Sequence, residues 1–327
     1  MPRFRCLRAF ALIALLALLA ACGKEQPSDA TAAASDPVGA VVALAGSLRD
    51  NDLERFYALS LPQELRERTA AAYNAKRATL PPADAKEREE FAQTMNTLTA
   101  PGAEDALYTQ IEPGLVKLEA EVSGQLPLMV AMGSGFASAA IAESDTLSED
   151  EKQHASAVLA AVASWAATAP LADRAKARAA IAALTASARA VQITDLDTLR
   201  TLDIEAALAK GGLLWAGVKQ ITALYGFDID AALSSVTAEA LHRDNDNARV
   251  KVGYTLLGKP VSFEMAMLQR DGRWYSADAI ARAEAALRVT RTDADAALGE
   301  EGVEAGTAAA PDDAAEAAAP SANVIAD

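Results

Sequence analysis

The chain has 327 residues and a formal net charge of −15, because 45 Asp and Glu outnumber 30 Lys and Arg. An acidic chain without a basic cluster lacks the surface that nucleic-acid binding requires, so nucleic-acid partners are excluded. The two cysteines, Cys6 and Cys22, both lie near the N-terminus, which excludes a disulfide framework or a cysteine-based metal site in the body of the chain.

Alanine is the most frequent residue, and only 5% of the residues are aromatic although 51% are hydrophobic. Alanine has the highest intrinsic helix propensity, but its side chain buries little apolar area. The composition therefore predicts a predominantly helical protein with Ala-rich helices and a thin core.

The N-terminal segment has the organisation of a secretory signal. Arg3, Arg5 and Arg8 precede an uninterrupted apolar run of 13 residues, Ala9 to Ala21. This run is too short to span a bilayer, which takes about 20 residues, and has the length of a signal-peptide core. We expect residues 1–21 to be a signal peptide.

The segment Leu19-Ala20-Ala21-Cys22 resembles the lipobox of bacterial lipoproteins. In that family the chain is cleaved before the Cys, whose thiol and new amino group are then acylated. The resemblance implies lipidation at Cys22 and a membrane partner held through acyl chains. Residue 23 is Gly rather than the Asp that retains lipoproteins in the inner membrane, so the resemblance implies the periplasmic side of the outer membrane.

Low-complexity segments flank the expected domain, residues 37–298. Residues 22–36 show no periodicity and predict a flexible tether. Residues 299–327 are rich in Ala, Glu and Asp and contain no aromatic residue. Such a segment buries too little apolar surface to offset the conformational entropy that it would lose on folding. We expect a disordered acidic tail.

Helix signals begin at Asp36-Pro37, an N-cap followed by a first-turn Pro. Asn51 or Asp52 is expected to cap a second helix, and Pro62 to open a third. The helical pattern then continues to about residue 236, and we expect its segments to be separated at Pro113-Gly114, Pro127, Pro170 and Gly211-Gly212. Ser148 and Glu151 are expected to form a capping box, because each can satisfy the other's free backbone donor.

The most apolar of these segments is Leu126 to Ala142. It is shorter than a membrane span, and its Gly133-Ser134-Gly135 lacks the preceding strand and third Gly of a phosphate-binding loop. We therefore expect a buried helix, in which Gly133 and Gly135 allow a neighbour to approach closely.

Near residue 236 the hydrophobic period changes to two. Apolar residues alternate with polar ones over 249–256 and again over 261–267, and Asp271-Gly272 is a strong hairpin signal. The pattern predicts an α+β fold with a three- to four-strand antiparallel meander at about 236–276 and a following helix at 279–289.

Two segments together resemble small NTF2-like domains of bacterial lipoproteins: the helix–turn–helix at Pro37 to Lys76, and the meander ending in Asp271-Gly272-Arg273-Trp274-Tyr275. The resemblance implies that helices lie in the concave face of a curved sheet and that Trp274 fills the core. The helical stretch between the two segments is far longer than that family's.

Candidate catalytic residues each have a structural alternative that we favour. His154 follows three acidic residues, as an oriented base would, but is expected to be an exposed helix residue because no nucleophile motif accompanies it. His242 precedes Asp244 to Asn247, which lacks the Gly and distant Glu of a calcium loop and predicts a hairpin turn. No metal or other cofactor is expected.

Two carboxylate pairs, Asp195 with Asp197 and Asp228 with Asp230, are close enough in sequence for acid–base work. Both stand where helices would begin, where acids satisfy free N–H groups. We favour helix caps, and the sequence provides no positive case for an enzyme.

Large side chains in the helical middle are candidates for lining a ligand site, namely Trp215, Tyr225 and Phe227, with Trp165 near them; filling the gaps that Ala leaves is the alternative. The leading hypothesis is a lipid-anchored periplasmic lipoprotein that binds an envelope protein or a small apolar ligand without catalysis. The alternatives are an envelope assembly or structural factor and a carboxylate-dependent periplasmic enzyme.

Overall fold

A computed structural model describes residues 35–122 and 124–289. The expected signal peptide, Cys22, most of the tether and the tail at 299–327 lie outside these residues. The contacts divide the chain into two compact units, Met1–Glu284 and Ala285–Asp327. All elements below belong to the first unit, except that a helix over 277–289 contains the first residues of the second.

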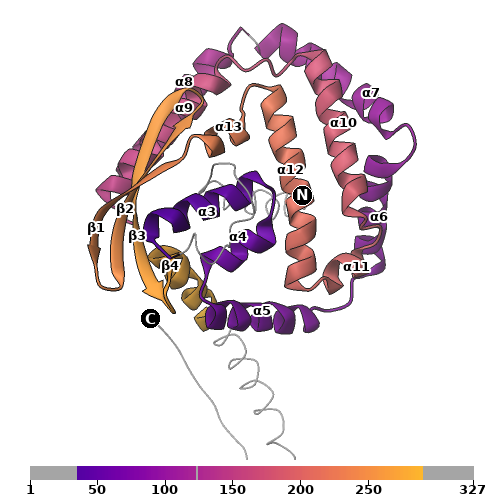
Figure 1. Cartoon of the computed structure of the whole chain (residues 1–327). Coiled ribbons are helices and arrows are strands. Elements are labelled where there is room, and N and C mark those ends of the chain that lie inside the picture. Colours follow the sequence, from indigo (N-terminus) through magenta and orange to yellow (C-terminus); the bar gives the residue numbers. More distant parts are fainter. Residues whose placement is uncertain (1–34, 123, 290–327) are drawn as a thin grey trace, which may run out of the picture. The chain divides into compact units, whose positions relative to one another are not determined.

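The fold is α+β and predominantly helical, as predicted, with the sheet at the C-terminal end (Figure 1). The helices are α3 (Pro37–Arg49), α4 (Leu53–Ser60), α5 (Gln63–Ala78), α6 (Ala85–Thr99), α7 (Ala103–Lys117), the π-helical turn η1 (Leu118–Val122), α8 (Leu126–Ala142), α9 (Glu149–Ala166), α10 (Arg174–Val191), α11 (Leu196–Thr201), α12 (Ile204–Leu224) and α13 (Ile229–Ser234). The strands are β1 (Thr237–Asp244), β2 (Asn247–Leu256), β3 (Lys259–Arg270) and β4 (Arg273–Ser276).

Side-chain caps explain where many helices begin. The Asp36 carboxylate accepts a hydrogen bond from the Val38 N–H at 2.9 Å, ahead of a Pro at the first position of α3. Asp52, rather than Asn51, caps α4, and Ser148 and Glu151 form the predicted capping box at the start of α9. These local signals are independent of the rest of the fold, which is why the sequence carries them.

The breaks predicted at Pro113-Gly114 and at Gly211-Gly212 are wrong, because Pro113 lies inside α7 and both Gly211 and Gly212 lie inside α12. Helix α7 continues for another turn to Lys117 and then widens into η1, and turns of this kind occur where the regular hydrogen-bond ladder is interrupted. Pro113 therefore does not end the helix, and the change in its backbone hydrogen-bond pattern follows at Leu118.

The sheet is an antiparallel meander in the order β1-β2-β3-β4. Its last hairpin turns at Asp271 (φ 52°) and Gly272 (φ 73°), the paired left-handed conformation that an Asp-Gly turn favours. The β2–β3 turn uses Leu257 (φ 52°) and Gly258 (φ 80°), which are both left-handed as well. A bulge between Ala240 and His242 interrupts the pairing of β1 with β2.

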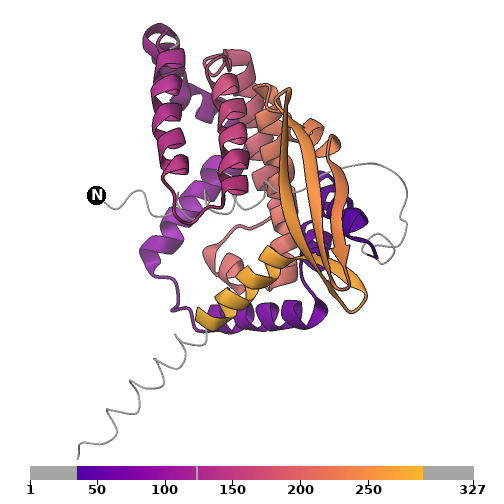
Figure 2. The ribbon, with the colours of Figure 1, turned by 90° about the vertical axis from the view of Figure 1, so that its left-hand side faces the viewer.

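One face of the sheet forms the core. Ala40 and Val41 of α3 pack against Val250, Met267 and Trp274, and Trp274 has no exposed surface. At the other end of the same face, α9 covers β2 and β3 through a cluster of Ala161, Leu256 and Val261. The opposite face carries exposed side chains, namely Arg249, Lys251, Ser262 and Glu264. Figure 2 shows α9 between α8 and the sheet.

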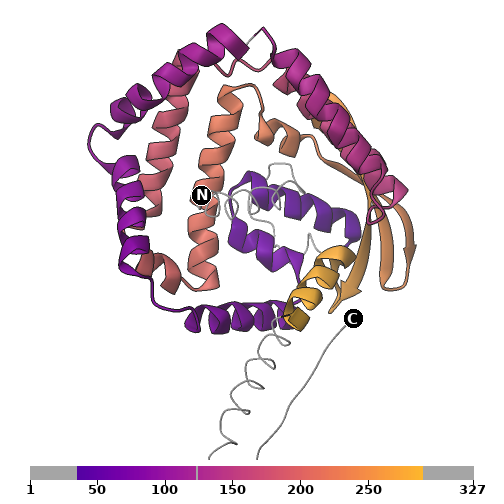
Figure 3. The same cartoon turned by 180° about the vertical axis from the view of Figure 1, so that it is seen from behind.

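The helical middle is organised on α12, which runs beside α10, while α6 and α7 lie against α10 (Figure 3). Two glycines of α12 permit close approach. A Cβ on Gly212 would stand 2.3 Å from the Asn51 carbonyl oxygen, and one on Gly217 would stand 2.1 Å from the Ser187 hydroxyl. Glycine at both positions therefore lets α12 contact the α3–α4 turn and α10 directly.

Candidate functional site

The most apolar helix of the described structure lies on the surface. The 17 residues of α8 include no charged side chain, and none of the 17 is buried. The half-buried residues recur every three or four positions and mark the side that packs on α9: Leu126, Val130, Ser134, Ala137 and Ile141. The prediction of a buried helix is wrong, because α8 packs along this one side and leaves the rest of its circumference exposed.

The outward side of α8 carries large apolar side chains. Exposed fractions are 65% for Leu128, 55% for Met129, 59% for Met132 and 75% for Phe136. A Cβ built at Gly133 or Gly135 would meet no described atom within 4 Å beyond the helix's own backbone. The close neighbour expected at the two glycines is thus absent from the described part of this chain. Contiguous exposed apolar surface marks interaction sites, whereas scattered single residues do not.

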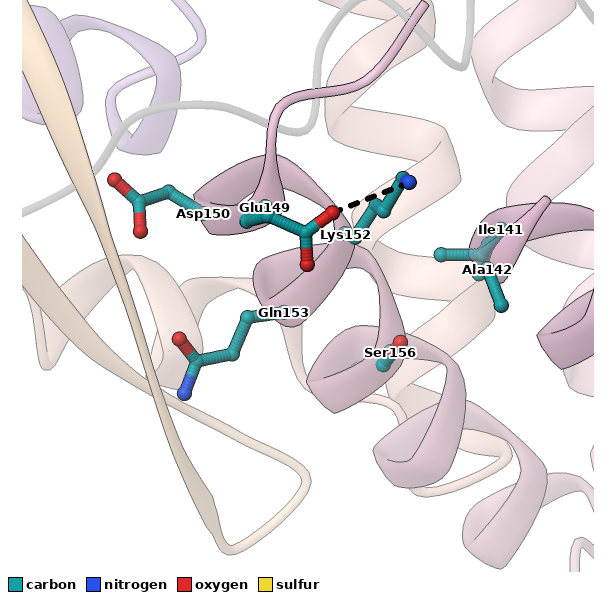
Figure 4. A pocket seen from close by; sticks show the side chains of 7 residues that line it. All are labelled: Ile141, Ala142, Glu149, Asp150, Lys152, Gln153 and Ser156. Atoms are coloured by element: carbon teal, nitrogen blue, oxygen red, sulfur yellow. Dashed lines mark ion pairs between the residues drawn. The ribbon is translucent and has the colours of Figure 1, made fainter. Parts of the chain in front are cut away.

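An open cleft of about 420 Å³ lies where the end of α8 meets the start of α9 (Figure 4). Lys152 forms an ion pair with Glu149 at 3.3 Å there, and the cleft is lined by Ile141, Ala142, Glu149, Asp150, Lys152, Gln153 and Ser156. A second open cleft, of about 320 Å³, includes Leu126 at the other end of α8. The two clefts therefore lie at the two ends of α8, and neither is lined by Leu128, Met129, Met132 or Phe136.

His154 is half-buried between α9 and the sheet, so the prediction of an exposed residue is wrong. Its Nε2 lies 3.0 Å from the Tyr254 hydroxyl oxygen, and its ring centroid lies 4.8 Å from that of Phe263. Burial lowers the pKa of His154 and raises the pKa of Tyr254 to about 12. Both groups are neutral at neutral pH, and the pair joins α9 to β2.

The carboxylates that precede His154 have other partners. Glu149 pairs with Lys152, and Glu151 accepts the Ser148 backbone N–H at 2.8 Å. This hydrogen bond from the Ser148 N–H makes the largest contribution to lowering the pKa of Glu151. These contacts place both carboxylates in the first turn of α9 rather than on the imidazole of His154.

The first residue of each acidic pair caps a helix, as predicted, whereas Asp230 of the second pair forms an ion pair with Lys219. Asp195 accepts the Thr198 N–H at 2.7 Å, which lowers the pKa of Asp195, and Asp228 accepts the Ala231 N–H at 2.8 Å. Asp197 instead forms an ion pair with Arg88 at 2.8 Å. Within residues 35–122 and 124–289, no cluster of three or more His, Cys, Asp or Glu is placed to hold a metal ion.

His242 lies on β1, where it pairs with Arg249 of β2. Asp244 ends β1 and Asn247 begins β2, so the Asp244 to Asn247 segment is the predicted hairpin turn. Asn245 has a φ of 47°, a left-handed conformation that Asn tolerates. The segment therefore serves as the tight turn that connects β1 to β2.

The three predicted ligand-lining residues occupy packing positions. Trp215 is 7% exposed, and its indole N–H donates to the Leu48 carbonyl at 2.8 Å. The Trp165 indole N–H donates to the Tyr225 carbonyl at 2.9 Å, and the Phe227 ring lies 5.3 Å from that of Trp165. The structure thus brings Tyr225 and Phe227 together beside Trp165. Neither of the two clefts described above is lined by Trp215, Tyr225 or Phe227.

The structure contains a buried lysine, Lys219, that the sequence did not predict. Lys219 is 5% exposed; its ammonium donates to the Arg49 carbonyl at 2.6 Å, at the end of α3, and forms an ion pair with Asp230. A cation at a helix C-terminus stabilises the helix dipole. No local pattern marks Lys219, because its partners lie on α3 and α13.

Comparisons with protein-family models, curated proteins and solved structures return no match for the chain. Among the helices that the structure describes, none has both the length and the apolarity of a bilayer span.

Proposed function

We propose that the chain is a lipid-anchored periplasmic lipoprotein of the outer membrane that acts as a non-enzymatic binding module, with α8 as the surface that binds a protein. The observation that carries the binding role is the exposed apolar side of α8, which includes Leu128, Met132 and Phe136.

The anchor rests on the sequence around Cys22. One acyl chain binds a membrane only marginally, at about 0.8 kcal/mol per buried CH₂, whereas two or three hold a protein stably. Residues 23–36 separate Cys22 from Pro37, the first residue of α3. A segment of that length spans at most about 50 Å. The anchor therefore keeps the domain close to the membrane surface.

A protein partner fits α8 better than a small molecule. Small ligands bind in concave sites that enclose most of their surface, whereas the outward side of a helix is convex. Protein interfaces are rich in Met and aromatic residues at their centres, and two Met and one Phe lie exposed on α8. The alternative function, an assembly or structural factor of the envelope, would bind its partner through the same exposed side of α8.

The NTF2-like relationship remains part of the proposal. It is supported by the packing of α3 on one face of the meander and by the full burial of Trp274 after the last turn. The helices α6 to α12 then form a long addition between the two parts of such a domain. Fold alone does not define function, so the binding role depends on α8.

The test is photo-cross-linking in the native envelope. A photoreactive amino acid at Phe136 of the full chain is expected to capture a protein, because the side chain at this position is 75% exposed on the proposed surface. The same amino acid at Lys251, on the open face of the sheet, is the matched control. Equal or absent capture at the two positions contradicts the proposal.

A further inference from the structure

Two of the large exposed side chains of α8 are placed symmetrically about Met132. Leu128 and Phe136 lie four residues before and after it, on the side of the helix that faces away from α9. Met129 and Gly135 lie three residues before and after it. We propose that the protein bound by α8 is a second copy of this chain, with the two α8 helices antiparallel about a two-fold axis at Met132. This inference rests on the proposed function of α8.

The antiparallel register pairs two large apolar side chains with each other and places one more opposite a glycine. Leu128 of one copy then faces Phe136 of the other, and Met129 faces Gly135, where a Cβ has open space in the single chain. Met132 meets its own equivalent on the axis. A two-fold interface must be self-complementary in this way, because each patch contacts a copy of itself. The two α8–α9 pairs together form a four-helix arrangement.

The charge distribution favours a second copy at this surface. The whole chain carries −15, whereas α8 contains no charged residue from Leu126 to Ala142. Acidic residues stand beyond both ends of the helix, at Glu143 and at Glu119, which forms an ion pair with Arg174 at 3.1 Å. They disfavour contact with anionic lipid headgroups, which attract basic segments. Two acidic chains therefore meet with the least electrostatic repulsion along a helix that carries no charge.

The size of the surface determines where the dimer forms. A helix of 17 residues is about 25 Å long, and one helix face buries less than the roughly 800 Å² per partner of a standard stable interface. The dimer is therefore weak between free copies in solution. Anchoring confines the copies to one membrane surface and raises their effective concentration, which favours pairing there.

Cysteine cross-linking of the full, membrane-anchored chain tests the inference. Cys6 leaves with the signal peptide and Cys22 is acylated, so an introduced cysteine is the sole free thiol. With a short bis-maleimide reagent, Met132→Cys is expected to give a cross-linked homodimer, and the matched control Lys251→Cys is not. Leu128→Cys and Phe136→Cys copies with different tags are expected to cross-link to each other more than either does to itself.

Adding Phe136→Glu to Met132→Cys is expected to lower the dimer yield about tenfold or more, because the interface would then bury an unpaired carboxylate. Circular dichroism verifies that this variant folds. Equal dimer yields from Met132→Cys and Lys251→Cys overturn the inference. If Phe136 photo-cross-links a different protein while Met132→Cys gives no dimer, the inference fails and the proposed function stands. If neither reagent captures any protein at α8, both fail.

Discussion

The imidazole Nε2 of His154 lies 3.0 Å from the hydroxyl oxygen of Tyr254, a residue 100 positions away in the sequence. Lys259 of β3 makes a second polar contact with α9 by donating to the Ala160 carbonyl at 2.9 Å. Since α8 packs on α9, these two contacts also position the exposed apolar side of α8 relative to the sheet.

The burial of His154 makes stability depend on pH. Burial lowers its pKa below the ordinary 6.5, so the unfolded chain takes up a proton first as the pH falls. The contribution of His154 to the free energy of unfolding is complete above about pH 7 and declines as the pH falls through 6.5 toward the lower folded-state pKa. Denaturant unfolding of the wild type and His154→Gln at pH 7.5 and pH 5.5 should show a smaller decline for the variant. Equal declines would show that His154 does not carry this dependence.

The exposed side of α8 should contribute little to the stability of a single copy. Phe136→Ser is expected to change the free energy of unfolding by less than about 0.5 kcal/mol at a protein concentration low enough to prevent association. Trp274→Ala, at a site with no exposed surface, is expected to cost about 3–5 kcal/mol. A loss above about 2 kcal/mol for Phe136→Ser would mean that its side chain is packed within one chain.

Position 212 should require glycine, because the α3–α4 turn packs directly against the backbone of α12 there. Gly212→Ala places a Cβ 2.3 Å from the Asn51 carbonyl oxygen and is expected to destabilise the protein by about 1–3 kcal/mol. Gly114→Ala is the matched control within a helix, because its Cβ meets no described atom within 4 Å, and it should stabilise by up to about 1 kcal/mol. Thermal or denaturant unfolding compares the two, and a stabilising Gly212→Ala would disprove the close packing.

Local signals in the sequence were sufficient for much of the fold. The Asp195 and Asp228 caps, the Ser148–Glu151 capping box and the Asp271-Gly272 turn depend on neighbouring residues alone, and the period-two alternation indicated the meander. These features were confirmed because their energetics are set within a few residues.

The errors arose where a residue's environment depends on distant parts of the chain. The composition of α8 showed that it is apolar, but whether a neighbour covers it is decided by the packing of α9, and only one side is covered. His154 looked exposed because Tyr254 and Phe263 belong to strands about a hundred residues later. Lys219 has its partners on α3 and α13, so no local pattern could identify it.

The indole of Trp215 should stabilise the end of α3. Trp215→Phe removes the indole donor and leaves the Leu48 carbonyl with the longer hydrogen bond from the Asn51 N–H at 3.2 Å, at an expected cost of about 0.5–1.5 kcal/mol. Tyr73→Phe is the control, because its hydroxyl donates to the Leu202 carbonyl at 3.5 Å on the exposed surface and its loss should be close to neutral. Denaturant unfolding measures both, and equal effects would contradict the role of the Trp215 bond.

The proposed anchor at Cys22 is the central claim, because the proposed envelope location of the protein depends on it. Mass spectrometry of the N-terminal peptide of the mature, membrane-bound protein tests it most directly. The predicted result is a chain that begins at Cys22, carries a diacylglyceryl group on the thiol and is acylated on the amino group. A chain that retains residues 1–21, or one with an unmodified Cys22 thiol, would contradict the claim.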